Sequence, residues 1–202
     1  MIKIGLTGGI ASGKSTVSDY LNNKYGVPII DADKIAYELA EPGKGIWQGY
    51  VDRYGKEKAL FPGGTLNRRA IADIVFSKPE EKAWMDSMAI PLVKAETERR
   101  ISQYEKDGLM AVVLDVPLMI EQEWNKMVDS LWVVYVNPQT QLERLMKRNG
   151  YDVETAEKRV ASQMSLEKKK KMADIVIDNS NAISDSQRQV DEAWKKLTLQ
   201  EE

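Results

Sequence analysis

Five short apolar runs alternate along the chain with stretches whose apolar residues recur at helical spacing. The runs have strand length, are rich in aliphatic and β-branched side chains, and occupy residues 1–7, 27–30, 110–114, 131–136 and 175–177. Continuous apolar strands that alternate with helices are typical of a parallel sheet covered on both faces. We therefore predict an α/β fold in which helices flank a mostly parallel five-stranded sheet. A last helix should present Val190, Trp194 and Leu197 on one face, and residues 198–202 should fray.

The segment between the second and third predicted strands is about 80 residues long, several times what a single crossover helix requires. Proline and glycine at 42–43 and 62–64, together with Pro91, are expected to separate helices within it, and Thr65 is expected to cap one of them. We predict that residues 38–106 form a helical insertion. Residues 1–37 and 107–202 are predicted to form the core.

Composition removes several classes of chemistry. The 202 residues include no Cys and no His, which excludes disulfides, zinc fingers, thiol nucleophiles and triads that need an imidazole. A metal ion would have oxygen ligands, with Mg²⁺ the first expectation. Because 29 Lys and Arg nearly balance 31 Asp and Glu, net charge favours neither nucleic acid nor an anionic membrane as a partner. No apolar stretch approaches the roughly 20 residues of a bilayer span. No secretory signal is recognised either, so we expect a cytoplasmic protein.

The strongest local signal is a glycine-rich sequence between the first predicted strand and the following helix. Residues 8–15 fit the pattern G-x-x-x-x-G-K-[ST] of a P-loop. Its glycines let backbone N–H groups wrap a phosphate, the helix adds its positive dipole end, and Lys14 adds a charge for the β and γ phosphates. Ser15 would ligate Mg²⁺. A turn that is glycine-rich for steric reasons alone is disfavoured, because Lys14, Ser15 and the flanking elements all match. The expected phosphate-binding residues are Gly8, Gly9, Ile10, Ala11, Ser12, Gly13, Lys14, Ser15 and Thr16.

Two carboxylates follow the second predicted strand. Asp31 and Asp33 therefore belong to the carboxyl edge of the sheet, where open α/β folds bind ligands. If the chain stays extended here, both side chains share one side. Without histidine, a carboxylate is the natural group to accept a proton from an attacking hydroxyl, and Asp33 is the candidate base. The alternative is that one or both cap the next helix, whose pattern begins near Lys34.

A third acid, Asp115, ends the third predicted strand, where an aspartate can hold Mg²⁺ opposite a P-loop. A buried aspartate satisfied by backbone N–H groups is an equal alternative. Residues 115–118 have no glycine in the fourth place, and the aspartate of residues 125–129 lies one residue too far for the guanine-reading N-K-x-D pattern. A GTPase switch is therefore disfavoured.

Residues 139–172 are basic, with nine Lys and Arg against five acids. Arg144 and Arg148 should share a helix face, as should Arg159 and Gln163. A turn at 149–150 would separate two helices into a hairpin. Such a hairpin suits a lid, at about 140–172, that closes over ATP and brings arginine onto the transferring phosphoryl group. The lysines at 168–171 are interpreted as a solvated face rather than a nucleic-acid patch.

Together these segments resemble the dephospho-coenzyme A kinase family nearly end to end. The resemblance rests on residues 6–16, 31–33, 64–68, Pro117 with Leu118, Arg159 with Gln163, and residues 173–179. It implies a P-loop core, a helical acceptor-binding domain and a lid. The implied activity is ATP-dependent phosphorylation of the ribose 3′-hydroxyl of dephospho-coenzyme A, with ATP as co-substrate and Mg²⁺ as cofactor.

The resemblance also implies roles for individual residues. Asp33 would be the base, Lys14 a catalytic and phosphate group, Arg148 and Arg159 the catalytic lid contacts, and Asn179 would lie near the adenine. Metal ligands would be Ser15 and Asp115, and the acceptor would meet Asp31, Asp33, Arg68, Pro117 and Leu118. Two positions depart from the family: Ile90-Pro91 stands where His-Pro is frequent, and Asn181 where glycine is frequent, although asparagine tolerates the left-handed backbone region.

Two alternatives remain open. One is another P-loop kinase that acts on nucleosides or nucleotides. The other is a nucleotide-gated binding protein whose loop only changes shape. The expected partner is a small-molecule substrate, with no nucleic acid and no membrane, and the expected state is a monomer or a small homo-oligomer.

Overall fold

The computed structural model describes residues 1–199 and divides the chain into two compact units. The first contains residues 1–29 and the chain from Gly108 onward, and the second contains Ile30–Asp107. The predicted insertion at 38–106 lies within the second unit. No helix among the described residues is both long and apolar enough to cross a membrane.

A five-stranded sheet forms the centre of the first unit, although Ile30 and Asp31 of its edge strand are assigned to the second. Its strands are β1 (Ile2–Gly8), β2 (Ile29–Asp31), β3 (Ala111–Asp115), β4 (Ser130–Tyr135) and β5 (Ile175–Asp178), in the order β2-β3-β1-β4-β5. β1 pairs in parallel with both β3 and β4, and β4 pairs in parallel with β5. The predicted α/β fold and mostly parallel sheet are confirmed, and each strand lies within two residues of its predicted bounds.

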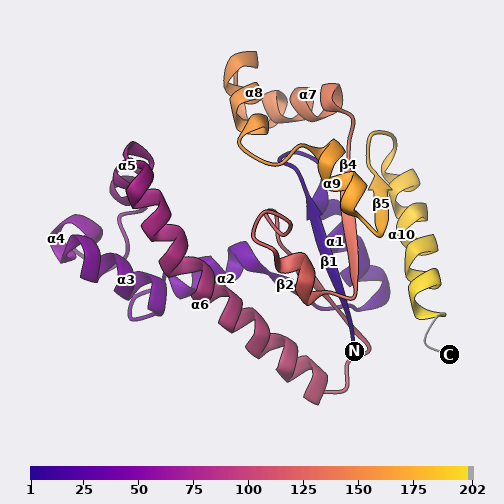
Figure 1. Ribbon diagram of the computed structural model, residues 1–202, viewed down its shortest axis with the longest axis horizontal. Helices are drawn as coiled ribbons and strands as arrows, with labels where there is room; N and C mark the ends of the chain where they lie inside the picture. Colours follow the sequence, from indigo (N-terminus) through magenta and orange to yellow (C-terminus); the bar gives the residue numbers. More distant parts are fainter. Residues whose placement is uncertain (200–202) are drawn as a thin grey trace. The chain divides into compact units, whose positions relative to one another are not determined.

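Helices α1 (Lys14–Tyr25) and α10 (Ile183–Thr198) cover one face of this sheet (Figure 1). Alternate strand residues such as Leu6 and Trp132 are fully buried there. The predicted apolar face of the last helix is confirmed, because Val190 joins this core and Trp194 stacks on Tyr25 with ring centroids 4.9 Å apart. Residues 198–202 are expected to fray. Thr198 is the last residue of α10, and residues 200–202 lie outside the described part of the chain.

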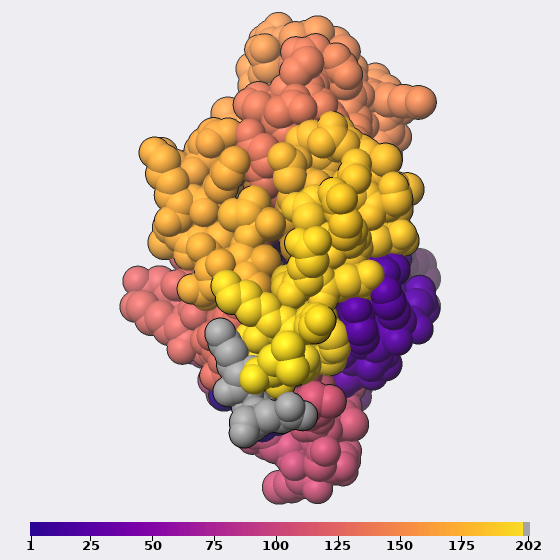
Figure 2. All heavy atoms as spheres, turned by 90° about the vertical axis from the view of Figure 1, so that its right-hand side faces the viewer, coloured from indigo at the N-terminus to yellow at the C-terminus, as the bar shows by residue number. Residues whose placement is uncertain are grey.

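The basic segment forms three helices, α7 (Pro138–Asn149), α8 (Val153–Ala161) and α9 (Leu166–Met172). A short 3₁₀ helix (Trp124–Met127) precedes β4. Gly150 ends α7 in the left-handed region, which confirms the predicted turn between two helices. Figure 2 shows α7 and α8, in orange, projecting beyond α10, in yellow. Because α8 ends at Ala161, Gln163 lies beyond it, and the predicted shared helix face of Arg159 and Gln163 is wrong.

The second unit is helical, as predicted for the insertion. It contains α2 (Ala32–Leu39), α3 (Gly45–Tyr54), α4 (Lys56–Ala59), α5 (Arg68–Ser77) and α6 (Pro79–Lys106). Thr65 does not cap a helix. Asn67 does so instead, since its side chain accepts a hydrogen bond from the Ala70 N–H at 3.1 Å.

The prediction that Pro91 separates two helices is also wrong, because Pro91 lies inside α6. Proline removes one helical hydrogen bond. The helix nevertheless continues past Pro91, and the residues that follow it pack into the unit, since Val93, Thr97 and Ile101 are buried. In the C-terminal half of α6, the Glu96 carboxylate forms ion pairs with Arg99 and Arg100. Arg100 also forms an ion pair with Glu38 of α2.

Candidate active site

The glycine-rich loop joins β1 to α1 and has the backbone of a phosphate cradle. Ala11 (φ 60°) and Gly13 (φ 84°) lie in the left-handed region, and Gly13 caps α1. Within residues 1–199, the N–H groups of Ala11, Gly13 and Ser15 donate to no protein acceptor, and the buried Ser12 Oγ has no partner. Unpaired donors around a turn at a helix N-terminus form an anion-binding concavity. The loop therefore fits the phosphates of a nucleotide.

Two of the glycines are required by neighbouring side chains. A Cβ atom on Gly13 would lie 2.1 Å from Asn179 Nδ2, and one on Gly9 would lie 2.6 Å from Gln141 Nε2. Gly13 also needs its positive φ, which an L side chain rarely adopts. Close packing behind the loop thus explains why these positions carry no side chain, in addition to the approach of a phosphate in front.

Lys14 forms an ion pair with Asp115. β1 and β3 are neighbours, with Leu6 opposite Asp115, so the strand end delivers this carboxylate beside the start of α1. Asp115 is only 4% exposed, and its partner is an ammonium rather than the backbone N–H groups of the alternative above. A charge-assisted hydrogen bond of this kind fixes the direction of the lysine.

A metal ion at this site would need oxygens from the nucleotide. Within the described residues, no three Asp or Glu side chains gather into a group that could hold a metal. Ser15, in the first turn of α1, and Asp115, at the end of β3, supply one hydroxyl and one carboxylate at the loop. Mg²⁺ accepts so few protein ligands, because it is usually bound through one or two carboxylates and substrate phosphates.

Three amide side chains form hydrogen bonds with the backbone of the loop, and the sequence patterns do not predict these contacts. Asn179 Nδ2 donates to Ser12 O at 2.8 Å, and Asn179 Oδ1 accepts from Ser186 Oγ at 2.7 Å. Gln163 Oε1 accepts from the Ile10 N–H, and Gln141 Nε2 donates to Ile10 O, both at 2.9 Å.

Lys169 is fully buried, so its interpretation as part of a solvated face is wrong. Its ammonium donates to Pro117 O at 2.7 Å and to Gly8 O at 3.4 Å, and pairs with Glu121 Oε1 at 3.0 Å. Burial lowers the pKa of Lys169, and Glu121 opposes that effect. The other three lysines of the run are exposed, as expected.

Comparisons with known proteins show which family has this sequence pattern. A family model described as dephospho-CoA kinase matches residues 2–185. The chain belongs to the dephospho-CoA kinase family. A relative named dephospho-CoA kinase from Symbiobacterium thermophilum is 44% identical over 192 residues, which cover 95% of this chain and 80% of that protein. Another from Bacillus thuringiensis is 45% identical over 198 residues, 98% of each protein. A crystal structure from Thermus thermophilus, 31% identical, matches 97% of each chain with a TM-score of 0.76.

The candidate lid residues of this family member face solvent. Arg148, in α7, and Arg159, in α8, are both exposed, and the Arg148 guanidinium donates to Asn149 Oδ1 at 2.9 Å. Within residues 1–199, neither side chain forms a hydrogen bond or ion pair with the loop. Pro117, which follows β3, lies near the start of the loop instead. Its O accepts from Thr7 Oγ1 at 2.9 Å and from the Lys169 ammonium, which also donates to Gly8 O. Leu118 is exposed.

In the second unit, Asp31 is a helix cap, one of the two alternatives for the carboxylates. Its Oδ1 accepts from the Lys34 N–H at 3.0 Å. The chain is not extended through Asp33, because α2 begins at Ala32, so the expectation of two carboxylates on one side of a strand is wrong. Asp33 lies exposed in the first turn of α2, near the positive end of the helix dipole.

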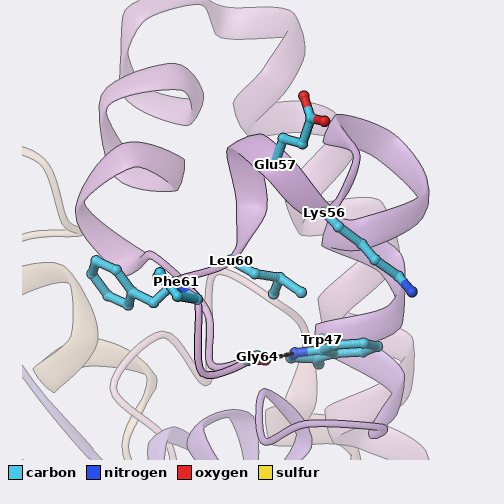
Figure 3. Close-up of a pocket in the computed structure, with 7 residues that line it drawn as sticks. Trp47, Lys56, Glu57, Leu60, Phe61 and Gly64 are labelled. Atoms are coloured by element: carbon cyan, nitrogen blue, oxygen red, sulfur yellow. Dashed lines mark hydrogen bonds between the residues drawn. The ribbon is translucent and has the colours of Figure 1, made fainter.

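Arg68 begins α5, and its guanidinium lies over the Tyr37 ring, 4.2 Å from the centroid. It also lines a cavity of about 180 Å³ beside Tyr50, whose pKa is raised by burial. A second pocket of about 680 Å³ lies between α3 and the loop before α5. Figure 3 shows Trp47 and Leu60 in its wall, with the indole N–H donating to Gly64 O at 2.8 Å.

The two departures from the dephospho-CoA kinase pattern have simple structural settings. Ile90 is a half-buried residue within α6. Asn181 does not use the left-handed region, because among residues 1–199 only Ala11 and Glu123 have a positive φ without being glycine. The turn is instead held by the Ser180 N–H, which donates to Asp178 Oδ1 at 2.9 Å.

Proposed function

We propose that this chain is a dephospho-CoA kinase, which transfers the γ-phosphoryl group of ATP to the ribose 3′-hydroxyl of dephospho-coenzyme A. This is the last step of coenzyme A synthesis. The observation that carries the proposal is the family match over residues 2–185, which includes both units. The loop geometry supports its nucleotide half, because it offers unpaired N–H donors beside an oriented lysine.

In this proposal the first unit binds and neutralises the triphosphate. Backbone N–H groups of residues 8–16 bind phosphate oxygens, and Lys14, directed by Asp115, neutralises charge at the transferring group. Ser15 and Asp115 would hold Mg²⁺, whose charge further offsets that of the phosphates. Asn179 is proposed near the adenine, and its hydrogen bond to Ser12 O would connect base and phosphate sites. Positioning and electrostatic stabilisation then supply most of the rate enhancement.

The second unit is proposed to bind the acceptor and to supply the base. Asp33, in the first turn of α2, accepts the proton of the attacking 3′-hydroxyl. Asp31 fixes the start of that helix through its cap and thereby positions Asp33. Arg68 is proposed to bind the diphosphate of the acceptor, since guanidinium pairs with phosphate in a bidentate manner.

The remaining groups complete the acceptor and phosphoryl sites. Arg148 and Arg159 are proposed to reach the transferring phosphoryl group when the hairpin closes, which agrees with their exposure. Pro117 and Leu118 would contact the acceptor. We further propose a cytoplasmic protein that acts as a monomer or small homo-oligomer on a small-molecule substrate.

An acceptor panel tests the proposal. The purified chain, with ATP and Mg²⁺, is offered dephospho-coenzyme A, nucleosides and nucleoside monophosphates, and the phosphorylated product is identified by mass spectrometry and ³¹P NMR. We expect phosphorylation of dephospho-coenzyme A at the 3′-hydroxyl. Phosphate transfer to nucleosides or nucleotides alone would identify a different P-loop kinase. Slow ATP hydrolysis without any phosphorylated acceptor would favour a nucleotide-gated binding protein.

A further inference from the structure

One residue of the phosphate loop is hydrogen-bonded from both ends of the arginine-bearing hairpin. The Ile10 N–H donates to Gln163 Oε1, and Ile10 O accepts from Gln141 Nε2, each at 2.9 Å. Gln141 lies in the first turns of α7, and Gln163 follows the end of α8. The hairpin formed by α7 and α8 therefore begins and ends at hydrogen bonds to the same loop residue.

The contact has little room to shift. Gln141 is only 5% exposed. A Cβ atom on Gly9 would lie 2.6 Å from Gln141 Nε2 and 3.1 Å from Leu166 Cγ, at the start of α9. The ammonium of Lys169, in α9, donates to the carbonyl oxygen of Gly8, the residue before Gly9. The segment around the hairpin thus contacts three consecutive loop residues, and a tightly packed interface transmits displacement rather than absorbing it.

We propose that Gln141 and Gln163 are positioning residues, which fix the hairpin carrying Arg148 and Arg159 to the phosphate loop through the backbone N–H and C=O of Ile10. The inference rests on the proposed kinase function. Ile10 immediately precedes Ala11, whose N–H is unpaired, so the same contact also sets the loop donors. Both side-chain amides are engaged with the Ile10 backbone, so neither is assigned a phosphate contact. Both act through the arginines and the loop backbone.

The two hydrogen bonds have opposite chemistry, which makes the proposal specific. Gln163 is an acceptor, so glutamate preserves its contact and methionine removes it. Gln141 is a donor, so both glutamate and methionine remove its contact, and glutamate also places a carboxylate against a carbonyl. A role in hydrogen bonding therefore makes glutamate and methionine differ at position 163 and agree at position 141.

The test measures kcat and KM for ATP in Gln163→Met, Gln163→Glu, Gln141→Met and Gln141→Glu. The matched control is Gln139→Met, an exposed glutamine of α7 that bonds Glu143 within its own helix. We expect kcat to fall about tenfold in Gln163→Met and in both Gln141 variants, with KM for ATP within about threefold, since a misplaced group costs mainly turnover. Gln163→Glu should recover most of the loss seen in Gln163→Met. Equal losses for glutamate and methionine at 163, or no loss at either position, would overturn the proposal.

Two further measurements separate positioning from loss of structure. Exchange of the Ile10 amide hydrogen should be faster in Gln163→Met, which removes the acceptor of that N–H. In Gln163→Glu and Gln141→Met, which leave that N–H its acceptor, the exchange rate should stay near that of the unaltered chain. Any other order of rates overturns the assigned contact. The variant that combines Gln163→Met with Arg148→Ala and Arg159→Ala should have nearly the same kcat as the variant with the two arginine substitutions alone, because the glutamine acts through those side chains. Multiplicative effects would contradict this. If the unaltered chain fails to phosphorylate dephospho-coenzyme A, the proposed function and this inference fail together, whereas normal transfer with unaffected variants removes this inference alone.

Discussion

Lys169→Met tests whether a lysine buried behind the phosphate loop stabilises the first unit. Methionine has a similar length and keeps the apolar stem, but it removes the ammonium that binds Pro117 O at 2.7 Å and Glu121 at 3.0 Å. Glu121 Oε1 would then keep only the Met164 N–H, at 3.1 Å. Its buried Oε2 has no partner among the described residues even before the substitution.

The expected loss follows from these contacts. Removing one partner of a buried ion pair costs about 3–5 kcal/mol, because the remaining charge is left uncompensated. The Glu121 side chain is 21% exposed, so water can solvate it in part. We therefore expect the free energy of unfolding to fall by about 2–3 kcal/mol, a large share of the roughly 5–15 kcal/mol typical of a domain.

Urea unfolding followed by circular dichroism measures the loss as a shift in the midpoint at constant slope. Lys168→Met is the matched control, since it makes the same change at an exposed position of the same helix and should stay within about 0.5 kcal/mol. Adding Glu121→Gln to Lys169→Met should recover at least about 1 kcal/mol by removing the uncompensated charge. A Lys169→Met protein as stable as the control would refute the reasoning.

Three other substitutions give measurable outcomes. Lys14→Ala should lower kcat by about 10² or more, as for the loss of one preorganised charge stabiliser, and a fall of less than about threefold at saturating ATP would remove Lys14 from that role. Asp33→Asn should leave folding and calorimetric ATP binding intact while transfer falls by about 10² or more, and near-normal turnover would exclude Asp33 as the base. Glu96→Gln tests acid stability, because the Arg99 hydrogen bond, with help from Arg100, lowers the pKa of Glu96 from 4.5 to about 2. A lowered folded-state pKa contributes stability above pH 4.5 that is lost toward pH 2. The stability difference between the unaltered chain and Glu96→Gln should therefore shrink over that range, and a constant difference in acid unfolding curves would contradict the assignment.

The features that sequence predicts correctly are those determined by short stretches of chain. The five strands are continuous apolar runs, and a run of that kind can be buried only between layers of helices. The phosphate loop is similar, since strand, glycines, Lys14 and helix follow one another directly. Gly150 ends its helix for an equally local reason, the left-handed backbone that glycine adopts without strain.

The errors at helix starts also have local causes. The chain offers more than one capping side chain, and propensity alone does not choose among them. Asn67 rather than Thr65 caps α5, and α2 begins at Ala32, two residues before the predicted start near Lys34. The early start of α2 moves Asp33 from a strand edge to a helix N-terminus.

The contacts behind the loop could not be predicted, because they join residues that are far apart in the chain. Lys169 belongs to a run of four lysines, and only the face of α9 turned toward Pro117 and Gly8 distinguishes it from its exposed neighbours. Gln163 likewise is separated by 153 residues from Ile10. A local motif therefore indicates that a loop can bind phosphate, whereas the side chains that hold it in shape follow from the packing of the whole unit. In a P-loop kinase, substitutions far from residues 8–16 in sequence should consequently alter turnover as strongly as many within it.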